Sequence, residues 1–107
     1  MLIATTNDVA GHEVKEVLGE VFGLTVRSRH LGSRIGASLK SLFGGELAGM
    51  TKMLAEGREE AIRRVVAEAE KRGANEILAF RFDTSELGGN WTEIGAYDTA
   101  ARIERVR

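Results

Sequence analysis

The chain has 107 residues, of which 43% are hydrophobic and 29% are charged, a composition typical of one small globular domain. Its 15 basic residues nearly balance its 16 acidic ones, so the basic excess typical of nucleic-acid-binding proteins is absent. The chain contains no cysteine, which excludes disulfides, thiolate metal sites and cysteine nucleophiles.

The amino-terminal segment, MLIATTND, lacks the basic flank and the long apolar run of a secretory signal peptide. No apolar stretch approaches the roughly 18 residues that a membrane-spanning helix needs. We therefore expect a cytoplasmic protein whose partners are neither membranes nor nucleic acids.

The first quarter of the chain is expected to contain two strands. Residues 2–6 form a short strand, and residues 13–26 form a longer one because valine and leucine are frequent there. Gly19 and Gly23 lie inside this second strand. They indicate a bulge or a close approach of another backbone segment.

A polar loop over residues 27–33 and a short helix over residues 34–43 are expected to follow. Gly44 and Gly45 then separate this helix from a longer one and are interpreted as a joint between the two. A phosphate-binding loop is excluded here, because Glu46 stands where that motif needs lysine.

The long helix is predicted over residues 46–72, where apolar residues recur every three or four positions. Its apolar face is formed by Leu47, Met50, Leu54, Ala61, Val65 and Ala69. The solvent-facing side carries three acid-first i,i+4 pairs, which are Glu59–Arg63, Glu60–Arg64 and Glu68–Arg72. Gly57 lies within the apolar face, although glycine costs about 1 kcal/mol of helix propensity relative to alanine. We therefore expect it to permit close packing against the sheet or a neighbouring subunit.

The remaining residues are predicted to form a β-hairpin. Strands over residues 76–84 and 91–106 flank a glycine-containing turn at residues 87–90. The predicted order is ββααββ in a single domain, residues 1–107. This order indicates an α+β fold of two layers, with a short and a long helix on one face of an antiparallel sheet.

Arg58 is the most informative charged residue, because it lies on the apolar side of the long helix. A guanidinium group there needs a partner. Asp83 is one candidate, a carboxylate of another chain is a second, and a bound ligand is a third. His12 and His30 are too few for a metal site. No nucleophile–base–orienter set is visible, which predicts a protein without catalytic activity.

The order and spacing of several short motifs resemble those of the YbjQ family of small bacterial and archaeal proteins. The motifs are Thr5-Thr6, Gly11, Gly23, Gly44-Gly45, Arg58-Glu59, Ala61, Gly73-Ala74, Asp83 and Thr99-Ala100. The resemblance spans nearly the whole chain. It implies a dodecin-subunit-like fold and assembly into a homopentamer. No established activity comes with it, and the heavy-metal-binding label that the family sometimes carries is an expectation rather than a demonstrated mechanism.

The chain departs from this pattern in ways that bear on metal binding. Glu46 and Met50 stand where family members usually have arginine and tyrosine, and Arg81 replaces an acidic residue two positions before Asp83. Arg81 and the lack of cysteine weaken the case for a soft metal. We hypothesise a non-enzymatic homo-oligomer, expected to be a pentamer, that holds a small ligand or metal ion at subunit interfaces. Arg58, Asp83, Gly44, Gly45 and Gly57 are the candidate ligand or interface residues. A structural or protein-interaction subunit without a ligand is the alternative.

Overall fold

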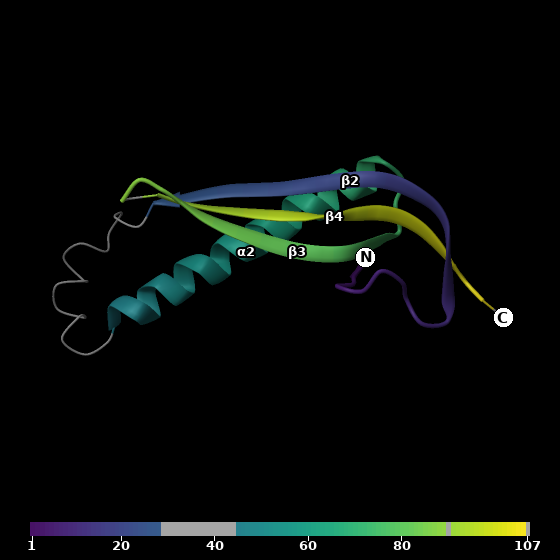
Figure 1. Ribbon diagram of the computed structural model, residues 1–107, viewed down its shortest axis with the longest axis horizontal. Coiled ribbons are helices and arrows are strands. Elements are labelled where there is room, and N and C mark those ends of the chain that lie inside the picture. Colours follow the sequence, from purple (N-terminus) through teal and green to yellow (C-terminus); the bar gives the residue numbers. More distant parts are fainter. Residues whose placement is uncertain (29–44, 90, 107) are drawn as a thin grey trace.

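The computed structural model describes residues 1–28, 45–89 and 91–106 as four strands and a helix (Figure 1). In chain order, the elements are β1 (Leu2–Ile3), β2 (His12–Ser28), α2 (Gly45–Lys71), β3 (Glu76–Leu87) and β4 (Trp91–Arg105). The α+β class is therefore confirmed. The short helix predicted over residues 34–43 and the joint residue Gly44 lie outside the described residues.

The strands form one mixed sheet in the order β1-β3-β4-β2. The hairpin of β3 and β4 is antiparallel as predicted, and β2 pairs antiparallel along nearly the whole length of β4. β1, however, pairs parallel to β3. The prediction of a purely antiparallel sheet was wrong because the amino-terminal segment enters beside β3, and the long β2 takes the opposite edge.

Several strand boundaries also differ from the predicted ones, and β3 ends at Leu87 rather than at residue 84. Arg27 and Ser28 were expected in a loop, but they extend β2 by pairing with Thr92 and Trp91 of β4. β1 ends at Ile3 rather than at residue 6. The long helix, in contrast, lies within one residue of its predicted start and end.

One face of the sheet is covered by α2, which crosses the strands obliquely (Figure 1). Ala61, Val65 and Ala69 of the helix are fully buried, as their spacing predicted. They pack in one core cluster with residues from all three long strands, among them Val21, Ile77, Phe80, Ile94 and Ala96. The core therefore lies between the helix and a single face of the sheet.

Two glycines set how closely α2 approaches the sheet. A Cβ atom on Gly23 of β2 would lie 2.0 Å from the backbone oxygen of Ala61, and one on Gly57 would lie 2.3 Å from Cδ1 of Ile94. A Cβ atom cannot lie so close to another heavy atom, so neither position accepts a side chain in this packing. Gly57 thus packs against the sheet, one of its two predicted roles, and Gly23 shows the close backbone approach expected from its place in β2.

Replacement of Gly57 by leucine should lower the melting temperature and alter assembly, because the larger side chain collides with Ile94. Gly49→Leu is a control in the same helix, since no described atom lies within 4 Å of the position of its Cβ. Thermal unfolding and sedimentation would check both variants. An unchanged melting temperature and mass for Gly57→Leu would contradict the close-packing role.

The charged side of α2 only partly follows the predicted pairing. Glu60 and Arg64 form the expected i,i+4 pair, with 2.5 Å between Oε1 and Nη2. Glu68 instead pairs with Lys71, and Arg72 reaches backbone carbonyl groups of β2. The prediction of a Glu68–Arg72 pair was therefore wrong, because the edge of the sheet offers Arg72 other acceptors.

Candidate functional site: the bare face of the sheet

The sheet face opposite α2 carries large apolar side chains that no described element covers. Neighbouring strand residues point to opposite faces, so the residues that alternate with the buried Val21, Gly23 and Thr25 point away from the helix. The exposed apolar side chains on this side are Phe22, Leu24, Val26, Leu87, Trp91 and Tyr97. We call this surface the bare face. The side chain of Phe22 is 62% exposed, which is unusual for a phenylalanine in the middle of a long strand.

A hollow lies in the bare face among Phe22, Leu24 and Tyr97. Three carboxylate residues, Glu20, Asp83 and Glu93, also line it. Its lining therefore combines aromatic rings with negative charge. These carboxylates do not form a metal site within one chain, because the described residues contain no group of three metal-ligating side chains.

Arg58 and Asp83 do not meet within the chain. The guanidinium carbon of Arg58 lies 4.8 Å from the centre of the Phe82 ring, which is a cation–π distance. Phe82 packs against the core beneath α2, whereas the adjacent Asp83 lines the hollow in the bare face. Among the described residues, Arg58 thus contacts the ring of Phe82 rather than the carboxylate of Asp83. A carboxylate of another chain and a bound ligand stay predicted partners.

The other candidate glycines fall at different places. Gly45 is the first residue of α2, and Gly57 lies in the interface between the helix and the sheet. Gly44 lies outside the described residues. The structure therefore brings only Asp83 among the candidate residues into the hollow.

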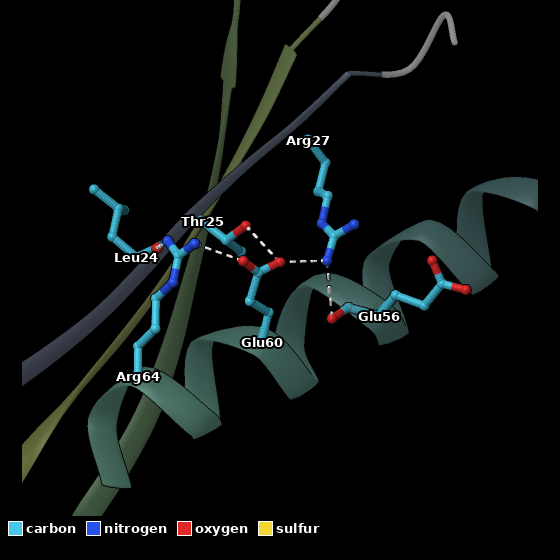
Figure 2. Close-up of polar contacts among 6 residues, drawn as sticks. All are labelled: Leu24, Thr25, Arg27, Glu56, Glu60 and Arg64. Carbon is cyan, nitrogen blue, oxygen red and sulfur yellow. Dashed lines mark hydrogen bonds and ion pairs between the residues drawn. The ribbon is translucent and has the colours of Figure 1, made fainter. Parts of the chain in front are cut away.

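A polar cluster around Glu60 ties α2 to β2 (Figure 2). Oε2 of Glu60 lies 2.5 Å from Nη2 of Arg27, and Oε1 lies 2.5 Å from Nη2 of Arg64. Thr25 donates a further hydrogen bond of 3.4 Å to the same carboxylate. Both oxygens of Glu60 are thus engaged within the chain, so we interpret this cluster as an anchor for the helix.

Asp98 is the most unusual titratable residue among those described. It is 5% exposed, and neither carboxyl oxygen has a hydrogen-bond partner. Burial, with a smaller contribution from the negative charge of Glu20, raises its pKa from an ordinary value of 3.8 to about 7. A carboxyl group in this setting favours its neutral form.

The strand beside Asp98 is irregular. The register of β3 and β4 shifts between Leu78 and Arg81, which forms a bulge next to the position of Asp98. Ala79, within this bulge, has a φ of 52°, in the left-handed region that residues other than glycine rarely adopt.

Sequence reasoning missed Asp98 and, in the cluster around Glu60, the contacts with Arg27 and Thr25, although it predicted the Glu60–Arg64 pair. Asp98 carries a recognisable signal, because it continues the inward-facing series of Ile94, Ala96 and Ala100 along β4. The sequence gives no comparable signal for Arg27, because the polar run over residues 27–33 predicts a loop there. Its pairing with Glu60 depends on contact between elements distant in sequence.

A family model described as "Putative heavy-metal-binding" matches residues 1–104. The chain belongs to the YbjQ family. It is 61% identical over 106 residues to a UPF0145 protein of Acidothermus cellulolyticus, covering 99% of this chain and 98% of that one. It is 62% identical over 105 residues to a UPF0145 protein of Streptomyces coelicolor, covering 98% and 99% of the two chains.

A solved structure of a DUF74 family protein of unknown function from Pediococcus pentosaceus shares the fold of this YbjQ protein. The TM-score is 0.63, and the match covers 97% of this chain and 98% of the other at 16% sequence identity. At that identity the likeness shows the fold alone.

The residues described for this YbjQ protein do not fit a heavy-metal ion bound within one chain. The sequence has no cysteine, and the described histidine, aspartate and glutamate side chains do not gather in threes. His12 contacts the backbone oxygen of Ala10 at 3.0 Å, and His30 lies outside the described residues.

No helix in the described part of the chain is long and apolar enough to cross a membrane.

Proposed function

We propose that this YbjQ protein is a non-enzymatic homo-oligomeric module, expected to be a pentamer, in which other copies cover the bare face. The observation that carries this proposal is the exposure of six large apolar side chains on one continuous sheet face. Exposed apolar patches of this kind mark interaction sites in soluble proteins. Self-association is supported by the chain's near-zero net charge, which imposes little repulsion between copies.

The hollow beside Asp83 gives this assembly a place for a ligand. Because the hollow lies within the bare face, a small molecule or ion held there would lie at a boundary between subunits. A metal ion would need ligands from more than one chain, since one chain supplies no group of three within its described part. A positively charged ligand fits the carboxylate-rich lining better than an anion does.

Assembly through the bare face can be tested by placing a charge at its centre. Phe22→Glu should reduce the mass of the oligomer at micromolar concentration, because a buried unpaired carboxylate opposes association. Ala55→Glu on α2 is the matched control, since Ala55 is exposed and lies away from the bare face. Sedimentation velocity would measure both masses. A Phe22→Glu protein that is folded and retains the wild-type mass would contradict the proposed interface.

Ligand binding needs a separate measurement on untagged protein. Native mass spectrometry with elemental analysis should detect a bound ion or small molecule at a fixed ratio to subunits, and Asp83→Asn should reduce that ratio. An oligomer with nothing bound, and with no thermal shift from a broad panel of ions, would favour the alternative of a structural or protein-interaction subunit.

A further inference from the structure

The outer edge of β2, over residues 12–27, is the longest edge without a strand partner in the described part of the sheet. β2 has 17 residues, and its only strand partner there is β4. The opposite edge, on β3, is partly occupied by β1 and by backbone hydrogen bonds with Ala4, which donates and accepts, and with Thr6, which accepts. An exposed strand edge presents unpaired backbone groups, which are a template for pairing with another chain.

Two arginines of α2 reach over this edge. Nη1 of Arg72 donates to the backbone oxygens of Leu18, at 3.3 Å, and Glu20, at 2.8 Å. Nη1 of Arg64 donates to the backbone oxygen of Leu24. Two side chains, placed two helical turns apart, thus occupy three outward-facing carbonyl groups of one strand.

A short gap remains between the two arginines. The ladder between β2 and β4 is regular from Gly19 to Ser28, so alternate residues direct their backbone groups the same way. Because the carbonyl groups of Glu20 and Leu24 point outward, the N–H and C=O of Phe22 point outward as well. A hollow beside this position is bounded by Arg64, Lys71 and Arg72 of α2. Between the carbonyl groups held by the two arginines, only the outward N–H and C=O of Phe22 could pair with another strand. One such position is too short for stable strand addition while the arginines stay in place.

We propose that Arg64 and Arg72 guard the edge of β2 against pairing with β2 of a second copy of this chain. An antiparallel β2–β2 pair centred near Phe22 would be isologous, so each copy would present the same edge to the other. In that arrangement, Arg72 of one copy would face Arg64 of the other. The two arginines therefore oppose pairing in two ways. They occupy the carbonyl groups that pairing needs, and their positive charges repel those of a second copy.

Removal of both guards tests the proposal. Arg64→Ala/Arg72→Ala should form species of at least twice the wild-type mass in sedimentation velocity, growing with protein concentration. The amide of Phe22 should become at least tenfold more protected from hydrogen exchange, because pairing through the edge would bury it. This second readout separates edge pairing from a general loss of helix anchoring, which would lower protection instead.

Lys52→Ala/Arg63→Ala is the matched control. Like the Arg64/Arg72 variant, it removes two positive charges from exposed positions of α2, but it should keep the wild-type mass and exchange pattern. A folded double guard variant with unchanged mass and unchanged exchange at Phe22 would overturn the proposal. If the double variant does not fold, each single variant must show the same two changes to a smaller degree, and single variants without them overturn it equally.

The proposal does not depend on how the wild-type protein assembles. The wild-type mass, whatever its value, is the baseline, and the bare face is untouched in these variants. Loss of assembly in Phe22→Glu and gain of mass in the guard variant are therefore separate outcomes.

Discussion

Replacement of Gly23 by alanine is expected to destabilise the protein by about 3 kcal/mol, at the upper end of the usual cost of overpacking. The added Cβ atom would lie 2.0 Å from the backbone oxygen of Ala61 and 2.8 Å from Cγ2 of Val65. A flexible side chain could turn away from such a contact, but the carbonyl group of a helix cannot. α2 would have to lift from the sheet along its length, which reduces the burial of the core.

The matched control for this variant is Gly95→Ala in β4. A Cβ atom there would lie 3.8 Å from its nearest neighbours, which is ordinary van der Waals contact. Thermal unfolding should therefore show a fall of roughly 10 °C or more for Gly23→Ala and little change for Gly95→Ala. Equal melting temperatures for the two variants would show that α2 does not depend on this contact for its position.

Replacement of Asp98 by asparagine should remove a pH dependence of stability. The folded-state pKa of Asp98 is raised to about 7 from 3.8, so the folded protein binds a proton more tightly than the unfolded chain does. The wild-type contribution from this group is consequently favourable in acid, and it is lost as pH rises from about 4 to about 7. Asparagine does not ionise, so the variant should gain stability relative to wild type across that interval.

The shift of about three pKa units corresponds to at most about 4 kcal/mol at pH 8, at 1.36 kcal/mol per unit. The measurement is the difference in melting temperature between variant and wild type at pH 4 and at pH 8. Asp8→Asn is the control, because Asp8 is exposed and is not one of the residues of the bare face or of the hollow. A difference for Asp98→Asn that is equal at both pH values would show that the carboxyl group finds a partner in solution.

Local patterns predicted the elements of this fold better than their arrangement. Alternation and helical spacing depend on neighbours in the sequence, so the hairpin of β3 and β4 and the bounds of α2 were predicted within a few residues. The parallel pairing of β1 depends on which edge the long β2 occupies. That choice is made by contacts between distant segments, for which the sequence contains no local signal.

In the candidate site, too, features set by local sequence could be predicted, whereas contacts between distant segments could not. Gly57 could be predicted as a packing residue because it interrupts an apolar helix face, and the structure places it against Ile94. Arg58 was expected beside a carboxylate or a bound ligand, yet it lies over the ring of Phe82. Helical spacing fixes the direction in which a side chain leaves the helix, but the strand residue that meets it depends on the crossing angle of helix and sheet.

The strand order also bears on how the protein is made. β2 precedes its partner β4 in the chain, so residues 29–90 and β4 itself must be synthesised before the two strands can pair. Contacts of such long sequence separation form slowly. During that interval β2 holds its apolar side chains and both of its edges open to other molecules. We expect early release of the ribosome-bound chain, before β4 emerges, to give aggregates, and nascent-chain solubility measured against length would reveal the threshold.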